Sequence, residues 1–178
     1  MSRIVTPFSE AVTADSAEVY AQIRKAASRV PNTFATIGAL APAALKVILE
    51  ADLVLASGTL NRRDREAIKL AVSEAVGCDY CAAAHVQLGK FAGLTPEELK
   101  QIRLGQPTGN AKRDALVHFV RNLVRTSGTI SSDEFSRIKA AGYTDRQLVE
   151  ISLALAVVTF TNAFNRINDT TLDFPAAA

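Results

Sequence analysis

Residues 65–90 read REAIKLAVSEAVGCDYCAAAHVQLGK. This stretch holds both cysteines of the chain, Cys78 and Cys81, one of its two histidines, His85, and an acid further upstream, Glu66. At about 100° per residue, a helix through the motif places the two cysteines and the histidine within about 60° of arc on one face. The three side chains are therefore expected to lie together.

A glycine separates two helical patterns in this stretch. Gly77 is typical of the residue that follows the last turn of a helix, so a helix that starts near Asn61 is expected to end there. The chain can then reverse, which would bring Glu66 back alongside the thiols. The sequence thus predicts a Cys-x-x-Cys at a helix N-terminus, with an acid from the preceding helix beside it.

The residue types in this motif indicate redox chemistry. Two thiols two residues apart close a small disulfide ring, and a helix N-terminus lowers a thiol pKa from about 8.5 into roughly the 3.5–7.5 range. His85 follows Cys81 by one helical turn, where it can accept a proton or stabilise a thiolate. Glu66 can orient the imidazole. We therefore predict a redox-active dithiol formed by Cys78 and Cys81.

Other uses of the same residues remain open. The Cys-x2-Cys-x3-His spacing supplies three zinc ligands, and Glu66 or His118 could add a fourth. Structural zinc sites usually draw ligands from a second knuckle, which this sequence does not contain, so a metal-free site is expected. The cysteines could also be small buried hydrophobic residues. Glu74 competes for the acid role, although it lies about 80° around the helix from Glu66.

The rest of the chain predicts helices throughout, because no long stretch alternates with period two as a strand would. The expected fold is all-α, a compact bundle of about seven or eight helices, in one domain over residues 1–178 with an N-terminal arm at 1–12. Helices are expected over residues 15–27, 42–57, 61–76, 78–93, 96–103 and 111–127, with one or two turns over 32–40 and two further helices capped by Ser131 and Thr144. The expected apolar face of the 42–57 helix consists of Leu45, Ile48, Leu49 and Leu53.

The last helical segment, residues 148–167, is apolar nearly all the way round. Such a helix must be covered on most sides, so part of this surface is expected to face another copy of the chain. Asn162 and Asn165 interrupt it and need hydrogen-bond partners if they are buried. They could support the active site or an interface, but a structural hydrogen bond is expected. Its most apolar part, residues 151–164, is expected to be too short to span a bilayer.

Composition narrows the classes of partner. The chain has 20 basic and 18 acidic residues, a formal charge of +2, which gives no electrostatic reason to expect nucleic acid. The first residues lack the apolar stretch of a secretion signal, so we expect a cytoplasmic protein that binds neither nucleic acid nor membranes. In a reducing compartment, two cysteines are more often catalytic or metal-binding than a structural crosslink.

The motif Glu-x11-Cys-x2-Cys-x3-His, with glycine before the first cysteine and an aromatic residue before the second, resembles a known family. It is similar to the core of the alkylhydroperoxidase D-like branch of the carboxymuconolactone decarboxylase superfamily. Segments 30–32 (Val-Pro-Asn) and 58–60 (Gly-Thr-Leu) and the terminal Asn162-x2-Asn165-Arg166 agree with it. Where the best-characterised peroxidases of that family carry a further histidine, this chain has Tyr80.

The resemblance implies a peroxidase-like thiol oxidoreductase with no bound cofactor and no metal. Cys81 would attack a small hydroperoxide, Cys78 would close the disulfide, and His85 and Glu66 would assist. An external dithiol reductant or a disulfide carrier protein would restore the thiols, and the chain would form a homo-oligomer, a trimer or hexamer. The alternatives are a regulatory dithiol module that only exchanges disulfides and, less in keeping with a cysteine pair, lactone decarboxylation.

Overall fold

The computed structural model of the chain describes residues 2–5 and 14–177. Within these residues it has nine α-helices and no strand. This confirms the predicted all-α bundle, with more helices than the seven or eight expected. Most of the predicted N-terminal arm lies outside the described residues. The helices are α1 (Ala14–Ala27), α2 (Asn32–Leu40), α3 (Pro42–Ala56), α4 (Arg62–Ala75), α5 (Asp79–Phe91), α6 (Pro96–Leu104), α7 (Ala111–Arg125), α8 (Ser132–Ala140) and α9 (Asp145–Asn168).

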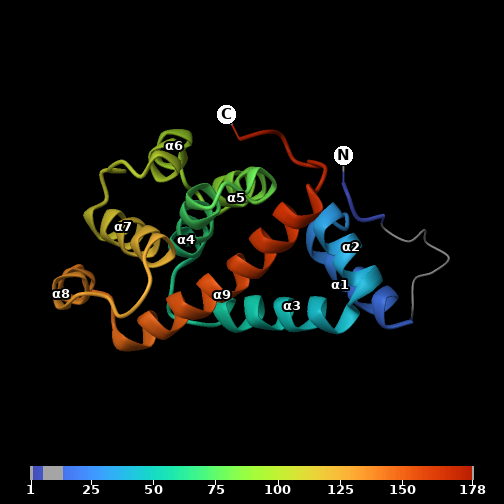
Figure 1. The fold of residues 1–178 in the computed structure, drawn as a ribbon, viewed down its shortest axis with the longest axis horizontal. Helices are drawn as coiled ribbons and strands as arrows, with labels where there is room; N and C mark the ends of the chain where they lie inside the picture. Colours follow the sequence, from blue (N-terminus) through green and yellow to red (C-terminus); the bar gives the residue numbers. More distant parts are fainter. Residues whose placement is uncertain (1, 6–13, 178) are drawn as a thin grey trace.

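Two helices organise the bundle. Helix α4 packs against α5, α6, α7 and α9, and α9 packs against α2, α3, α4 and α5. In Figure 1, α9 crosses the molecule diagonally, with α1, α2 and α3 on one side of it and α6, α7 and α8 toward the other end. The main core therefore lies around α4, which is the helix that carries Glu66.

The helix starts follow the sequence signals. Each predicted capping side chain accepts a hydrogen bond from the backbone N–H three residues later, as short polar side chains do at helix N-termini. The capping residues are Asn61, Thr95, Ser131 and Thr144. At Thr95 and Thr144 the third helical residue also accepts from the cap's own N–H, which completes a capping box.

The turn between α4 and α5 has the predicted glycine geometry. Gly77 has a φ of 70°, in the left-handed region that glycine adopts without steric cost. The N–H of Cys78 donates to the carbonyl of Ser73 at 2.9 Å, and that of Gly77 to the carbonyl of Glu74 at 3.2 Å. These bonds satisfy the last carbonyls of α4 and reverse the chain, so α5 packs back on α4.

Helix α9 is 24 residues long. By length and composition alone the whole helix could cross a membrane, whereas the expectation concerned only residues 151–164 within it. One side of the helix, however, contributes Ile151, Ala154 and Val158 to the core. The buried Asn162 and Asn165 on this helix both form hydrogen bonds with other helices of the bundle.

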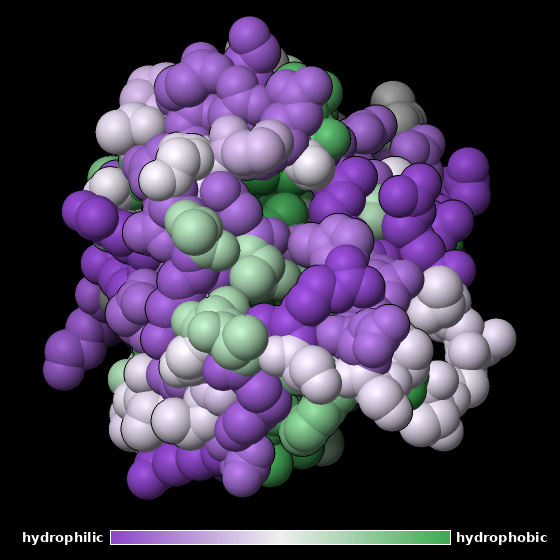
Figure 2. Space-filling view, turned by 90° about the vertical axis from the view of Figure 1, so that its left-hand side faces the viewer, coloured by the Kyte–Doolittle hydropathy of each residue, from purple (hydrophilic) through white to green (hydrophobic). Residues whose placement is uncertain are grey.

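The other side of α9 and part of α3 expose apolar side chains, including Val149 and Ile167 on α9 and Val54 on α3. Leu53 was expected on the inward face but is 69% exposed. The buried face of α3 instead consists of Leu45, Ile48 and Leu55. By contrast, hydrophilic residues cover most of the end of the molecule that carries α8 (Figure 2).

The described start of the chain lies against the end of α9. The N–H of Arg3 donates to the carbonyl of Asn168 at 2.7 Å, and the N–H of Ile4 to the side-chain oxygen of Asn168 at 2.7 Å. The N–H of Ser2 donates to the hydroxyl of Thr171 at 3.0 Å. After α9, the residues that follow Asp169 form a tail without secondary structure, which passes the N-terminus of α5.

Candidate active site

The two cysteines lie at the N-terminus of α5, as the sequence predicts. Cys78 is the N-cap residue, and its sulfur accepts a hydrogen bond from the N–H of Cys81 at 3.4 Å. The two sulfur atoms are 2.6 Å apart, and both residues are free thiols with 3% of their surface exposed. This geometry allows a disulfide to form with little movement of the helix.

The two thiols differ in acidity. The hydrogen bond with Cys81 lowers the pKa of Cys78, against the opposing effect of burial, and the Cys81 N–H lowers it further. The hydrogen bond with Cys78 and burial both raise the pKa of Cys81, although an amide of Asn165 acts to lower it. Of the two thiols, Cys78 therefore loses its proton more readily. The attacking role expected for Cys81 thus falls on the thiol with the raised pKa.

The predicted acid and base meet. The Nδ1 atom of His85 is 2.9 Å from the Oε2 atom of Glu66, and both side chains are largely buried. Burial acts to raise the pKa of Glu66, but the hydrogen bond and charge of His85 and the charge of Lys69 lower it overall. Glu66 is thus held as a carboxylate that fixes one ring nitrogen of His85.

An asparagine from α9 completes the contacts of the Cys81 sulfur. Asn165 donates an N–H to this sulfur at 3.2 Å, and its side-chain oxygen accepts the hydroxyl proton of Thr33 at 2.6 Å. Of the roles considered from the sequence, a structural hydrogen bond was preferred, but this contact places Asn165 at the candidate site. Asn162, one turn earlier, accepts from the hydroxyl of Ser73 at 3.1 Å, as a structural residue would.

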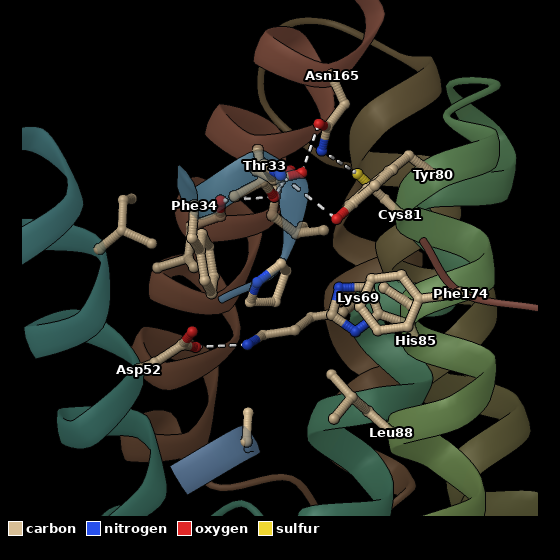
Figure 3. Close-up of a pocket in the computed structure, with 17 residues that line it drawn as sticks. Thr33, Phe34, Asp52, Lys69, Tyr80, Cys81, His85, Leu88, Asn165 and Phe174 are labelled. Carbon is tan, nitrogen blue, oxygen red and sulfur yellow. Dashed lines mark hydrogen bonds and ion pairs between the residues drawn. The ribbon is translucent and has the colours of Figure 1, made fainter. Parts of the chain in front are cut away.

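Cys81 and His85 line the same cavity, which has a volume of about 230 Å³ (Figure 3). Its walls are mainly aliphatic and aromatic, with Phe34, Leu88 and Phe174 among them. One charged pair, Lys69 with Asp52, lies in the wall. The cavity can therefore hold a small, largely apolar molecule with one end against the Cys81 sulfur.

Cys78 opens on a different hollow, about 540 Å³ in volume and more polar. Asp79, Arg166 and Asp169 line it, together with residues 170–172 of the tail. Tyr80 and Asn165 line both this hollow and the cavity. The two sulfurs are thus adjacent to each other but have different surroundings.

Tyr80, between the two cysteines, holds the tail. Its hydroxyl donates to a side-chain oxygen of Asp173 at 2.7 Å, and its ring packs edge-on against Phe174 with ring centres 5.6 Å apart. Burial, followed by the hydrogen bond to Asp173, raises the pKa of Tyr80, so the phenol stays protonated and acts as a donor. Tyr80 therefore both lines the site and packs against the tail.

Two residues considered from the sequence lie elsewhere. Glu74 pairs with Arg103 on α6 instead of with His85, so the structure brings Glu66, and not Glu74, to the imidazole. His118 is 3.4 Å from Glu134, at the contact between α7 and α8, and is not among the residues of the site. Among the described residues, no group of three or more histidine, cysteine, aspartate or glutamate side chains is arranged to hold a metal ion.

Residues 42–109, which run from the start of α3 through the dithiol motif to the loop after α6, match the model of the carboxymuconolactone decarboxylase family. This segment of the chain is similar to that family. No curated protein matches the sequence.

Solved structures share the fold of this chain. A peroxidase-related protein from Ralstonia eutropha JMP134, described as an alkylhydroperoxidase AhpD core, superposes with a TM-score of 0.85 at 22% identity, covering 97% of this chain and 92% of that one. The debrominase Bmp8 gives a TM-score of 0.80 at 17% identity, covering 97% and 94%. A putative antioxidant defence protein AhpD from Agrobacterium tumefaciens gives 0.70 at 21% identity, covering 78% and 96%.

Several site residues could not be identified from the sequence. Asn165 carried a signal, because an amide in an apolar helix needs a partner, but nothing in the sequence named the sulfur as that partner. Lys69 and Asp52 come from different helices, and a charged residue on a helix is usually solvated. Asp173 and Phe174 reach the site from the tail, beyond the last recognisable helix pattern.

Proposed function

We propose that this protein is a thiol-dependent, peroxidase-like oxidoreductase that reduces small hydroperoxides through a Cys78/Cys81 dithiol–disulfide cycle. The observation that carries the proposal is the position of the Cys81 sulfur. It belongs to a pair of adjacent thiols and also lines an apolar cavity together with His85, which is paired with Glu66. The relatives described as peroxidase-related proteins support the same reaction class.

The cycle has two chemical steps before reduction. The Cys81 sulfur attacks the terminal oxygen of a hydroperoxide ROOH, the O–O bond breaks, and Cys81 becomes a sulfenic acid while ROH leaves. The Cys78 sulfur then attacks the sulfenic sulfur, which forms the disulfide and releases water. The two thiols lose two electrons, and the peroxide gains both.

Protons must move for the first step to occur. The proton on Cys81 has to pass to Cys78 or to another base, because Cys81 attacks as a thiolate. Asn165 stabilises negative charge on the Cys81 sulfur by donating its N–H. His85, oriented by Glu66 in the same cavity, supplies the proton that the departing alkoxide needs. These roles use only side chains of this chain and require no bound cofactor.

Reduction of the disulfide needs an external dithiol. Its thiolate attacks one sulfur of the disulfide, and a second thiol then releases the mixed disulfide, leaving Cys78 and Cys81 reduced. The polar hollow beside Cys78 is the side from which a reductant or disulfide carrier protein reaches the pair. Because charged residues line this hollow, it suits a polar partner better than the apolar cavity does.

The test is peroxide-dependent turnover with a panel of small dithiols and dithiol proteins. Catalytic consumption of an organic hydroperoxide, lost on substitution of either cysteine, is the expected result. If the protein exchanges disulfides with a carrier but consumes no peroxide beyond the rate of a free thiol, the exchange-module alternative replaces the peroxidase.

A second candidate is reductive dehalogenation of a small aromatic compound. It is favoured by the aromatic and aliphatic cavity wall next to Cys81, and the debrominase Bmp8, with the same fold, has been solved with 2,3,4-tribromopyrrole. In that reaction an aryl bromide and two thiols would give the arene, bromide, a proton and the disulfide. Release of bromide, measured with the same dithiols, tests it against peroxide turnover.

We also propose that the chain assembles in the cytoplasm as a homo-oligomer, a trimer or hexamer. Free thiols need a reducing compartment, and the exposed apolar residues of α3 and α9 need a cover. Light scattering at micromolar concentration should show an oligomer, and Val149→Glu on α9 should weaken it. Phe135→Glu on α8, at the hydrophilic end, is the matched control and should not (Figure 2). A wild-type monomer would contradict the proposal.

A further inference from the structure

The tail that follows α9 lies over the apolar cavity. Phe174 lines this cavity and also lines a separate outer hollow of about 610 Å³, which Arg62, Gln87 and Phe91 line at the surface. Three other residues, Ala27, Pro31 and Leu88, also belong to both. The cavity and the outer hollow therefore adjoin each other along this shared wall.

Within that wall, Phe174 differs from the other three residues. Ala27, Pro31 and Leu88 belong to α1, to the turn after it and to α5, which are parts of the helical bundle. Phe174 belongs to the tail and carries the largest side chain of the four. Its ring is half-buried and contacts Tyr80 edge-on. In Figure 3 the ring lies at the edge of the cavity, on a segment of the tail that is separate from the helices.

The residue before Phe174 fixes the tail in place. Asp173 accepts hydrogen bonds from the guanidinium of Arg29 at 2.5 Å, from the N–H of Asn32 at 3.0 Å and from the hydroxyl of Tyr80 at 2.7 Å. The Arg29 guanidinium also lies 4.7 Å from the centre of the Phe174 ring. A surface ion pair alone contributes little, but several bonds to one carboxylate fix its position.

From these contacts we infer that Phe174 determines substrate size at this site, because its ring closes the cavity toward the outer hollow and Asp173 holds it there. The cavity of about 230 Å³ admits compact molecules to Cys81. Removal of the ring joins the cavity to the outer hollow, so that larger molecules reach the same sulfur. The inference deepens the proposed peroxidase function and rests on it only for the identity of the substrate.

The first experiment measures access to the thiols and does not depend on any activity. Reduced protein is treated with iodoacetamide, which is small, or with N-(1-pyrenyl)maleimide, which is bulky, and the labelling rates of Cys78 and Cys81 are followed by peptide mass spectrometry. Phe174→Ala should raise the rate of Cys81 with the bulky reagent by about 10-fold or more, while the iodoacetamide rate changes much less. The rates at Cys78, which opens on the other hollow, should stay close to those of the wild type.

Two further variants separate the size effect from general loosening. Phe91→Ala is the matched control, because Phe91 lines the outer hollow but not the cavity, and is 74% exposed. It should label like the wild type. Phe174→Leu keeps part of the side-chain volume and should give an intermediate rate with the bulky reagent. Equal acceleration of both reagents at both cysteines, or no change in Phe174→Ala, would overturn the inference.

The second experiment uses turnover. The ratio of kcat/KM for cumene hydroperoxide to that for tert-butyl hydroperoxide should rise about 10-fold in Phe174→Ala and stay unchanged in Phe91→Ala. If the wild type turns over neither peroxide while the labelling result holds, the proposed peroxidase function fails and the size-determining role of Phe174 stands. If turnover is normal but neither the ratio nor the labelling changes, Phe174 has no such role.

Discussion

The two cysteines differ more in their surroundings than in their position. Their sulfurs are 2.6 Å apart, yet Cys81 lines an apolar cavity of about 230 Å³ and Cys78 lines a polar hollow of about 540 Å³. Their pKa values also move apart, downward for Cys78 and upward for Cys81. The difference indicates that one dithiol can meet an apolar oxidant on one side and a polar reductant on the other.

The largest expected effect comes from replacing each cysteine in turn. Cys81→Ser should consume no hydroperoxide even in a single turnover, because the remaining thiol faces the polar hollow. Cys78→Ser should consume one equivalent and leave Cys81 as a sulfenic acid that cannot close the ring. Mass spectrometry after one equivalent of hydroperoxide, with a sulfenic-acid trap, distinguishes the two.

The charge distribution of the pair makes the reverse result informative. A trapped sulfenic acid on Cys78 in Cys81→Ser, and none on Cys81 in Cys78→Ser, would show that the thiol with the lower pKa attacks. The attacking role would then belong to Cys78, and the apolar cavity would not be the route of the oxidant.

The next effect concerns the carboxylate behind the cavity. Glu66→Gln should lower kcat by roughly 10- to 10⁴-fold, the range of general acid–base catalysis, because the amide cannot hold His85 in the same tautomer and orientation. Steady-state kinetics and circular dichroism measure activity and fold. Glu74→Gln is the control, since Glu74 pairs with Arg103. An active Glu66→Gln together with an inactive Glu74→Gln would show that Glu74, and not Glu66, is the catalytic acid.

A smaller effect is expected from the asparagine on the cavity side. Asn165→Ala removes the N–H that the Cys81 sulfur accepts, and a hydrogen bond to a charged group contributes about 1.5–3 kcal/mol, so single-turnover oxidation should slow roughly 10-fold or more. Asn162→Ala is the matched control, on the same helix and equally buried, but bonded to Ser73. Equal losses in both variants, with unchanged Cys81 labelling, would make Asn165 a purely structural residue.

The smallest expected effect is a shift in titration. Cys81→Ala removes the hydrogen bond that most strongly lowers the pKa of Cys78, so this pKa should rise toward the ordinary thiol value. At any pH below the midpoint, the thiolate fraction and the iodoacetamide rate of Cys78 then fall relative to the wild type. The pH dependence of labelling measures the shift. Tyr80→Phe, which loses the bonds of the phenol to Asp173 and to the N–H of Thr33 but none to either sulfur, should leave the midpoint in place. A downward shift in Cys81→Ala would contradict the hydrogen-bond explanation.

Much of the fold could be predicted because its signals are local. Capping residues such as Asn61 and Thr144 and the left-handed Gly77 act within one turn of chain, so their sequence patterns correspond directly to helix ends. The rotation of α3 was not predictable in the same way. Its sequence offers apolar residues on more than one face, and only packing against other helices leaves Leu53 exposed.

The site was predictable where its members lie on adjacent helices. Only one glycine turn separates the helices of Glu66 and His85, and in the structure the Oε2 atom of Glu66 lies 2.9 Å from the Nδ1 atom of His85. Thr33 and Asn165 lie 132 residues apart in the chain, yet they are hydrogen-bonded beside the sulfur. Such long-range pairs depend on how α2 and α9 pack, which periodicity in a single sequence does not encode.

Residues 2–4, at the described start of the sequence, pair with the end of α9 and with the tail that follows it. Asn168 bonds both Arg3 and Ile4, and Thr171 bonds Ser2, three residues before Phe174. When the tail detaches, the amide of Ser2 loses its acceptor on Thr171, whereas the amides of Arg3 and Ile4 keep theirs on Asn168, the last residue of α9. Amide hydrogen exchange at Ser2, compared with that at Arg3 and Ile4, thus reports how often the tail detaches.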